Sequence, residues 1–387
     1  MSRQAAGHEA GGRRAATLRH RAEALAAAHD EDRGSHAAVL IHAHRDAEGF
    51  YREQLAGSWA ETHLQQRHLQ PGPGTGYAPA GWTGLTTHLH RLGYTDIQLL
   101  DAGLGIPTRR NTVVDRFRDR LMFTVNDATG APVAFVGRKS PDNHNADAPK
   151  YLNSPETAVY RKSETLYGLG GADRLIRSGA TPVLVEGAID AQAVTQASRG
   201  RHIGLAALGT ALTAQHVQAL ADVAELRDRP VLLGYDADAA GYQATERAAA
   251  LLHHTGATVD VLTLPAGDDP ARAHRRGELA AALLDPAQRR GFVDVLIGNE
   301  IARWREYTDL RWPEDRVGCL RACARIIADG PVETAYPYAR RLAAVLDFPL
   351  DTTVAELLEA ISPSPPTIDH VPFAGPQSRA APRATER

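Results

Sequence analysis

The feature that most constrains the fold of this chain is a regular alternation of apolar runs and helical segments between residues 181 and 262. The apolar runs, which we predict to be strands, are Pro182–Val185, Ile203–Ala207, Val231–Tyr235 and Thr258–Leu262. The segments between them, which we predict to be helices, are Ala188–Ser198, Thr213–Leu226 and Ala239–His254. This alternation predicts an α/β domain with a mostly parallel sheet covered on both faces. In such a sheet, ligands bind at the carboxyl ends of the strands.

Acidic residues follow three of these four predicted strands. The three clusters are Glu186 with Asp190, Asp236 with Asp238, and Asp268 with Asp269. Carboxylates gathered at one edge of a sheet repel each other unless cations neutralise them, and Mg²⁺ or Mn²⁺ suits an all-oxygen set. Two such ions can clamp the attacking and leaving oxygens of a phosphoryl displacement. For Asp238 alone, the dipole at the start of its helix would be explanation enough, but three ordered clusters favour a metal site.

The other segments predict helices at both ends of the chain and a β-hairpin between them. We expect helices over Ala47–Leu69, Trp82–Leu92 and Asp285–Ile361, and a hairpin formed by residues 121–125 and 132–136. The resulting parts are a flexible or partly helical arm (1–45), a basic mixed α+β subdomain (46–178), the central α/β domain (179–284), a helical subdomain (285–361) and a disordered tail (362–387).

Charge is unevenly distributed along the chain, although the formal net charge is only -3. Residues 105–170 contain ten Arg or Lys against seven Asp or Glu, whereas residues 183–270 contain five against eleven. A basic segment followed by an acidic one suits an enzyme that steers phosphates with one part and holds cations with the next. Only Lys139, Lys150 and Lys162 are lysines among the 43 basic residues. They are candidates for positions that need a compact ammonium, with drift as the alternative.

Several classes of protein are excluded by what the sequence lacks. No apolar run reaches the length of a membrane span, and the N-terminus lacks the apolar core of a secretory signal. The two cysteines, Cys319 and Cys323, are too few for a disulfide framework or a structural zinc site. We therefore expect a cytoplasmic protein with no membrane association and no zinc in this chain.

Four motifs resemble the Toprim domain of bacterial DnaG-type DNA primases. They are V-E-G-x-x-D (185–190), A-L-G-T-A-L-T (207–213), Y-D-A-D-A-A-G (235–241) and L-P-x-G-x-D-P (264–270). Upstream motifs are similar to the basic N-terminal subdomain of the primase core: G-Y-A-P (76–79), D-R-F-R-D-R-L-M-F (115–123), K-Y-L-N-S-P-E-T (150–157) and Y-R-K to L-Y-G-L (160–169). Toprim motifs are shared with topoisomerases, nucleases and recombination proteins, whereas K-Y-L-N-S-P-E-T is far more specific to primases.

The resemblance implies roles for the residues that match the family's motifs. Glu186, Asp236 and Asp238 resemble the catalytic and metal-binding acids, with Asp190 and Asp269 as accessory ligands of Mg²⁺ or Mn²⁺. The residues that resemble those binding nucleotide or nucleic acid are Arg116, Arg118, Arg120, Arg138, Lys150, Asn153 and Lys162.

The chain departs from the family pattern at the third acidic cluster. Ala271 stands where the family usually has another acid, and Ala266 replaces a frequent aspartate, so that Asp268 is the residue left to compensate. We also expect the zinc-ribbon domain that normally precedes the core to be missing. Start-site choice would then come from a separate zinc-ribbon or initiation protein, or the enzyme would have little sequence preference at all. We also expect a mobile-element origin.

The sequence thus predicts a DNA primase-like enzyme that makes short RNA primers on single-stranded DNA by two-metal nucleotidyl transfer from NTPs. Two alternatives stay open: a Toprim-type metal-dependent nuclease, and a non-catalytic module that binds single-stranded DNA or a helicase. Besides the template and NTPs, the expected partner is a replicative helicase. We expect the protein to be a monomer.

Overall fold

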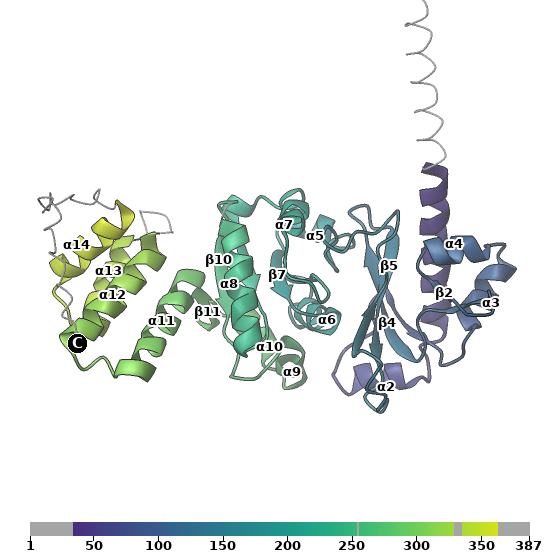
Figure 1. Cartoon of the computed structure of the whole chain (residues 1–387), viewed down its shortest axis with the longest axis horizontal. Helices are drawn as coiled ribbons and strands as arrows, with labels where there is room; N and C mark the ends of the chain where they lie inside the picture. Colours follow the sequence, from purple (N-terminus) through teal and green to yellow (C-terminus); the bar gives the residue numbers. More distant parts are fainter. Residues whose placement is uncertain (1–33, 254, 329–334, 363–387) are drawn as a thin grey trace, which may run out of the picture. The chain divides into compact units, whose positions relative to one another are not determined.

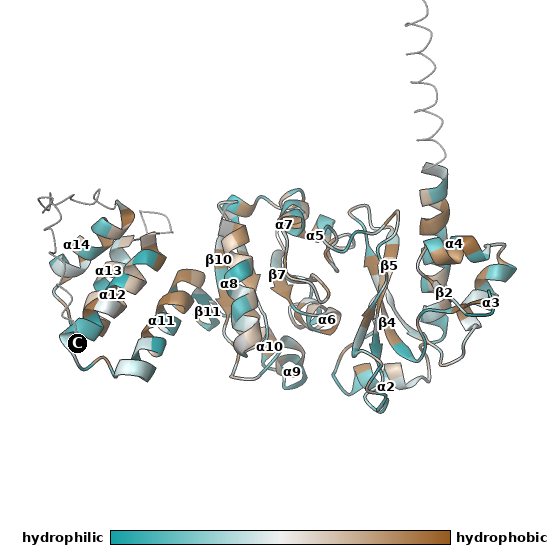
Figure 2. Ribbon diagram, viewed as in Figure 1, coloured by the Kyte–Doolittle hydropathy of each residue, from teal (hydrophilic) through white to brown (hydrophobic). Residues whose placement is uncertain are grey.

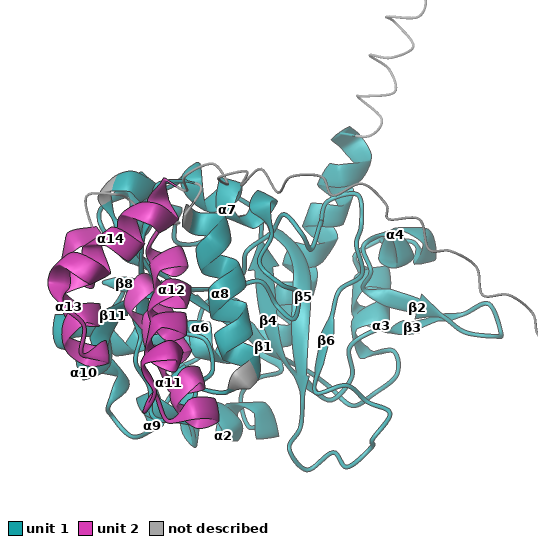
Figure 3. Cartoon of the chain, turned by 60° about the vertical axis from the view of Figure 1, so that its left-hand side comes forward, with its two compact units in different colours: residues 1–292 teal, residues 293–387 magenta. Residues whose placement is uncertain are grey.

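The computed structural model describes residues 34–253, 255–328 and 335–362 (Figure 1). The described chain forms two compact units, which meet in the sequence between Phe292 and Val293 (Figure 3). The expected flexible arm and disordered tail fall mainly on residues 1–33 and 363–387, outside the described residues. Residues 34–45 of that arm are helical.

The first unit opens with a helix over residues 34–53 and a four-stranded antiparallel sheet of order β1-β4-β5-β6. The strands are β1 (Thr75–Ala78), β4 (Arg120–Asn126), β5 (Pro132–Lys139) and β6 (Tyr151–Asn153). Strands β4 and β5 confirm the predicted hairpin. The Asp127 carboxylate closes its turn by accepting the backbone N–H groups of Thr129 and Ala131 at 2.8 and 2.9 Å.

The single helix predicted over Ala47–Leu69 is wrong. The first helix ends at residue 53, and a separate helix, α2 (Trp59–Gln65), follows it. Gly57 adopts φ 73°, a left-handed conformation that breaks the helix, and the Ser58 hydroxyl then caps α2 by accepting the N–H of Glu61 at 3.3 Å. A glycine and a capping serine outweigh the apolar pattern at this point.

A two-stranded ribbon and two short helices complete the part of the first unit before the central sheet. They are α3 (Gly84–Arg91), α4 (Asp96–Asp101), β2 (Gly105–Pro107) and β3 (Val113–Asp115). The helix predicted over Trp82–Leu92 is confirmed, although it begins two residues later. The buried Asp115 carboxylate accepts the N–H groups of Leu85 and Thr86, which lie in the first turn of α3.

The predicted parallel sheet is confirmed, with strand order β11-β10-β9-β7-β8. Its parallel strands are β7 (Thr181–Val185), β8 (His202–Ala206), β9 (Pro230–Leu233) and β10 (Thr258–Leu262). The chain first continues from β7 to β8 on one side and later adds β9 on the other. The carboxyl ends of β7 and β9 therefore form the topological switch point, where open α/β sheets bind ligands.

The helical expectation after Asp285 is wrong for a short stretch, because β11 (Arg289–Gly291) pairs antiparallel with β10 at the sheet edge. The remaining helices of the first unit lie just before the sheet in the sequence, between its strands or after β10. They are α5 (Asp173–Arg177), α6 (Ala188–Ala197), α7 (Ala214–Ala221), η1 (Leu226–Asp228), α8 (Ala239–His253), α9 (Pro270–Arg275), α10 (Leu279–Leu284) and η2 (Pro286–Gln288).

Buried side chains of alternate strand residues supply a core on each face of this sheet. Val183 and Val185 pack in one apolar cluster with residues of α6, α9 and α10, whereas Leu184 packs in another with residues of α7 and α8. Strand β7 is accordingly hydrophobic and buried over Val183, Leu184 and Val185 (Figure 2). A strand buried on both faces reads as a continuous apolar run, which is why the sequence located these strands.

The second unit is helical, as predicted for this part of the chain. Its helices are α11 (Phe292–Thr308, whose first residue belongs to the first unit), α12 (Pro313–Ala328), α13 (Ala335–Leu346) and α14 (Leu350–Ile361). Cys319 and Cys323 are both fully buried in its apolar cluster. Within the described residues, the helices are all too short or too polar to traverse a lipid bilayer.

Candidate active site

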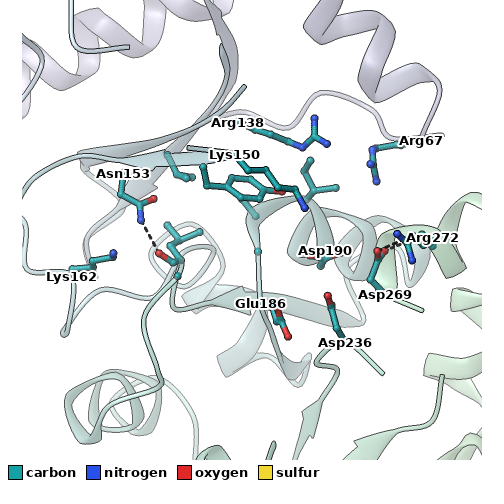
Figure 4. Close-up of a pocket in the computed structure, with 17 residues that line it drawn as sticks. Arg67, Arg138, Lys150, Asn153, Lys162, Glu186, Asp190, Asp236, Asp269 and Arg272 are labelled. Carbon is teal, nitrogen blue, oxygen red and sulfur yellow. Dashed lines mark hydrogen bonds and ion pairs between the residues drawn. The ribbon is translucent and has the colours of Figure 1, made fainter. Parts of the chain in front are cut away.

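A cavity of about 480 Å³ lies in the first unit beside the carboxyl ends of β7 and β9. It has a basic side and an acidic side, which come from different parts of the chain (Figure 4). Its charged and polar lining residues are Arg67, Arg138, Lys150, Asn153, Lys162, Glu186, Asp190, Asp236, Asp269 and Arg272. The structure thus brings together most of the residues that the sequence singled out over a span of more than a hundred positions.

Four carboxylates line the acidic side of the cavity, those of Glu186, Asp190, Asp236 and Asp269. Glu186 follows β7, Asp190 lies in the first turn of α6, and Asp236 follows β9. Burial and the neighbouring carboxylates Asp269 and Asp236 raise the pKa of Asp190 to about 7, although its carboxylate accepts the backbone N–H of Ala271 at 3.2 Å. Burial, followed by the negative charge of Glu186, raises the pKa of Asp236 to about 6. Mutual repulsion of this kind is what a bound cation relieves.

The pKa of Glu186 is also raised, first by burial of its carboxylate and then by the charge of Asp238. The backbone N–H of Asp236 and the ammonium of Lys150 act in the opposite direction on this pKa.

The turn from β9 into α8 requires a glycine at position 241. A side chain at Gly241 would collide with the Asp236 carbonyl, so the absence of one permits the tight turn.

Two carboxylates of the three acidic clusters, Asp238 and Asp268, do not line the cavity. Asp238 is exposed and does not line the cavity; it accepts the N–H of Gly241 at 2.9 Å, in the first turn of α8. Asp268 is buried against the Arg276 guanidinium, which lowers its pKa. The suggestion that Asp268 compensates for Ala271 stays a prediction, and the ion pair with Arg276 argues against it.

The basic side of the cavity contains two of the three lysines in the chain, as well as arginine. Lys150 precedes β6, Lys162 lies in the loop after it, and Arg138 projects from β5. Arg138 is 8% exposed, and its Nε has no hydrogen-bond partner among the described residues. A buried guanidinium N–H without a partner favours an anionic ligand.

Two arginines of the cavity were missed by the sequence reasoning. Arg67 follows α2 and comes from a segment without any motif, and its pKa is lowered by burial and by the nearby Arg138. This crowding of positive charge again favours an anion. Arg272 lies in α9, and a signal existed in the sequence, because it stands three residues after Asp269.

Three of the four arginines predicted to line the basic face do not line the cavity. Arg116 donates to the Asn153 carbonyl oxygen at 3.0 Å, and Arg118 lies 4.3 Å from the ring centroid of the exposed Trp82. Arg120 is buried and donates to the carbonyl oxygens of Gly137 and Pro149 at 2.9 and 3.1 Å. Arg116 and Arg120 thus support the strands that present Arg138, Lys150 and Asn153.

The donor set of the cavity fits divalent cations that a substrate helps to hold. Among the described residues, no group of three acidic, histidine or cysteine side chains is tight enough to hold a metal ion. Mg²⁺ in nucleotide enzymes usually takes only one or two carboxylates, and substrate phosphates and water complete its shell. The carboxylates of the cavity would hold the metal ion, and the lysine and arginine side chains opposite them would bind the substrate phosphates.

The comparisons with known proteins agree with this geometry. Residues 50–173 match the family described as the DNA primase catalytic core, N-terminal domain, and residues 183–274 match the Toprim-like family. The RNA polymerase domain of the Mycobacterium tuberculosis primase DnaG, solved with a double-stranded DNA oligomer that has a 6-nucleotide overhang, is 31% identical. That likeness covers 81% of this chain and 98% of the other, with a TM-score of 0.67. The chain belongs to the DnaG-type primase catalytic-core family.

Curated relatives give the same result. The DNA primase of Streptomyces coelicolor is 35% identical over 302 residues, which are 75% of this chain and 45% of the relative. The DNA primase of Deinococcus radiodurans is 42% identical over 206 residues, 52% of this chain and 34% of the relative. The primase-family chain described here therefore spans less than half the length of either curated relative.

Proposed function

We propose that the chain synthesises short RNA primers on single-stranded DNA by nucleotidyl transfer from NTPs. The observation that carries this proposal is the single cavity in which Arg138, Lys150 and Lys162 face Glu186 and Asp236 (Figure 4). Lysine and arginine bind a triphosphate, and carboxylates bind the cations that accompany it. A nucleotide seated between the two sides would meet both requirements at once.

The reaction joins a 3′-hydroxyl oxygen to the α-phosphorus of an incoming NTP and breaks the bond to the β-phosphate, with release of pyrophosphate. Bound Mg²⁺ or Mn²⁺ would neutralise charge on the attacking and leaving oxygens. We assign Asp190 and Asp236 to hold these cations, with Asp238 as a further ligand from the same loop. Lys150, Lys162 and Arg138 orient the triphosphate.

Glu186 is assigned either to accept the proton of the attacking 3′-hydroxyl or to hold a cation. Its pKa is raised by burial, which makes the carboxylate a better proton acceptor than an exposed glutamate. Its place directly after β7 puts it at the switch point of the sheet.

The template is proposed from both the geometry and the relatives. One solved relative is described as the DnaG primase catalytic domain bound to ssDNA; it is 28% identical and covers 82% of this chain and 99% of the other, with a TM-score of 0.62. The exposed Trp82, with the Arg118 guanidinium over its ring, offers this chain a surface on which a base can stack. Replication in the cytoplasm would then supply a helicase and a separate initiation protein as partners.

A ribonucleotide incorporation assay tests the proposal. Wild-type protein with single-stranded DNA, NTPs and Mn²⁺ should yield short RNA, and Glu186→Gln and Asp236→Asn should abolish it. Glu246→Gln, on the exposed surface of α8, is the matched control and should leave synthesis unchanged. Folded wild-type protein that cleaves DNA without NTPs, or that binds DNA without making RNA, would contradict the proposal in favour of a nuclease or a binding module.

A further inference from the structure

The carboxylates around the cavity fall into two groups that differ in their partners. Glu186 and Asp236 accept no side-chain hydrogen bond, and Asp190 accepts only a backbone N–H, among the contacts resolved in the described residues. Asp268 and Asp269 each have an arginine of their own, Arg276 and Arg272. A cation can therefore bind the first group without competing with a side-chain partner, whereas at the second group it competes with an arginine.

Both oxygens of Asp269 are occupied by the first turn of α9. Its Oδ1 accepts the backbone N–H of Arg272 at 2.7 Å and so caps the helix, while its Oδ2 lies 3.2 Å from Nε of the same arginine. The Arg272 guanidinium is anchored further by a hydrogen bond of 2.8 Å from Nη1 to the Gly267 carbonyl oxygen. Figure 4 shows the guanidinium beside the Asp269 carboxylate at the rim of the cavity.

A guanidinium in this position supplies the positive charge that a metal ion would otherwise supply. It carries a full positive charge at every physiological pH, and its planar fork offers several N–H donors to a carboxylate and a phosphate at the same time. An ion that entered here would compete with a charge-assisted contact and with the cap of α9, and it would meet the positive charge of Arg272 at close range.

We propose that Arg272 takes the place of a metal ion at Asp269, so that the cations of this cavity are held among Glu186, Asp190, Asp236 and Asp238 without Asp269. This inference rests on the proposed function only in assuming that the same cavity binds divalent cations. Arg272 acts as a fixed positive charge at the rim, beside the position where the phosphates of a bound nucleotide would lie. It is a positioning residue of the cation site rather than a group that reacts.

Counting bound Mn²⁺ tests the proposal without any reference to catalysis. The full chain, free of nucleotide, is titrated with Mn²⁺ at pH 7.5 and low ionic strength, and free Mn²⁺ is measured by electron paramagnetic resonance. Arg272→Ala should bind one more ion per chain than the wild type, because Asp269 is released and the repelling charge is removed. Arg275→Ala, which removes an exposed arginine from the same helix, should leave the number unchanged.

Asp269→Asn separates the two possible arrangements, and asparagine keeps the helix cap so that folding is preserved. In the wild-type background this substitution should leave the number of bound ions unchanged, and in the Arg272→Ala background it should remove the additional ion. The proposal is overturned if Asp269→Asn alone loses an ion, or if Arg272→Ala gains none while its thermal unfolding matches that of the wild type.

The two proposals fail in different ways. A protein with the expected Mn²⁺ numbers that makes no RNA contradicts the proposed function alone. A protein that makes RNA but holds an ion through Asp269 contradicts the role of Arg272 alone.

Discussion

The side-chain amide of Asn153 donates a hydrogen bond of 2.8 Å to the carbonyl oxygen of Leu208. Asn153 ends β6 at the edge of the antiparallel sheet, and Leu208 follows β8 of the parallel sheet with a left-handed φ of 53°. Few non-glycine residues adopt this conformation. The bond therefore joins the two sheets across the cavity and holds the strained loop that presents Gly209 to it.

Replacing Asn153 by Ala should destabilise the first unit and loosen this loop. The expected loss in the free energy of unfolding is about 1 kcal/mol, the usual value for one hydrogen bond. Urea unfolding measures this loss, and the NMR order parameter of the Gly209 amide should fall. An unchanged order parameter at Gly209 would mean that the loop is held by other contacts and that Asn153 acts only on a ligand.

Replacing Lys150 by Met should lower kcat/KM for NTP by about 10- to 150-fold, which corresponds to the loss of one charge-assisted contact to phosphate of about 1.5–3 kcal/mol. Lys139→Met is the matched control, because Lys139 donates to the Asn145 carbonyl oxygen at 2.9 Å and does not line the cavity. Steady-state kinetics on a fixed template make the comparison. Equal losses in the two variants would show that lysine charge acts only at long range.

Replacing Asp236 by Asn should stabilise the metal-free protein while it removes activity. A raised pKa means that the folded state favours the neutral carboxyl, so the charged form opposes folding above about pH 6. The free energy of unfolding at pH 7.5 should rise by about 1 kcal/mol after allowance for solvent screening. Denaturation in EDTA measures it, and a lower stability of the variant would contradict the repulsion inferred among the carboxylates.

Acid should destabilise the first unit through His44, which is fully buried in the helix over residues 34–53 and stacks on Phe135 at 5.8 Å. Burial lowers the pKa of His44 from 6.5 to about 4. Between these values the unfolded chain binds a proton that the folded chain does not, so stability present above pH 6.5 is lost as the pH falls toward 4. From pH 7.5 to 5 the loss should approach about 2 kcal/mol.

The variant His44→Phe keeps an aromatic ring beside Phe135 and removes the proton. Its free energy of unfolding should therefore vary less with pH than that of the wild type, by the amount assigned to His44. Parallel slopes for the two proteins between pH 7.5 and 5 would show that His44 is protonated without cost, or that other groups dominate.

Much of the parallel sheet could be predicted because buried strands such as β7 read as unbroken apolar runs. The break at Gly57 and the short β11 could not be read in this way. At Gly57 a single backbone conformation overrides a helical pattern, and β11 consists of Arg289, Arg290 and Gly291, whose strand conformation depends on pairing with β10. Tertiary pairing of this kind leaves no local signal.

The acidic side of the cavity was predictable because its members follow strands, so that topology alone brings Glu186 and Asp236 together. Whether a carboxylate is paired with an arginine could not be predicted from the sequence. Asp269 and Asp268 look equivalent to Glu186 in the sequence, and only side-chain geometry shows that Arg272 and Arg276 occupy them. Arg67 was missed for a similar reason, since nothing in its own segment indicates which cavity it lines.

The measurement that tests the account most directly is whether the template dictates the product. Poly(dT) should direct incorporation of ATP alone, poly(dC) should direct incorporation of GTP alone, and Asp236→Asn should make no product on either. RNA synthesis that ignores the template, or metal-dependent DNA cleavage with no RNA from folded wild-type protein, would contradict the central claim that this cavity carries out template-directed nucleotidyl transfer.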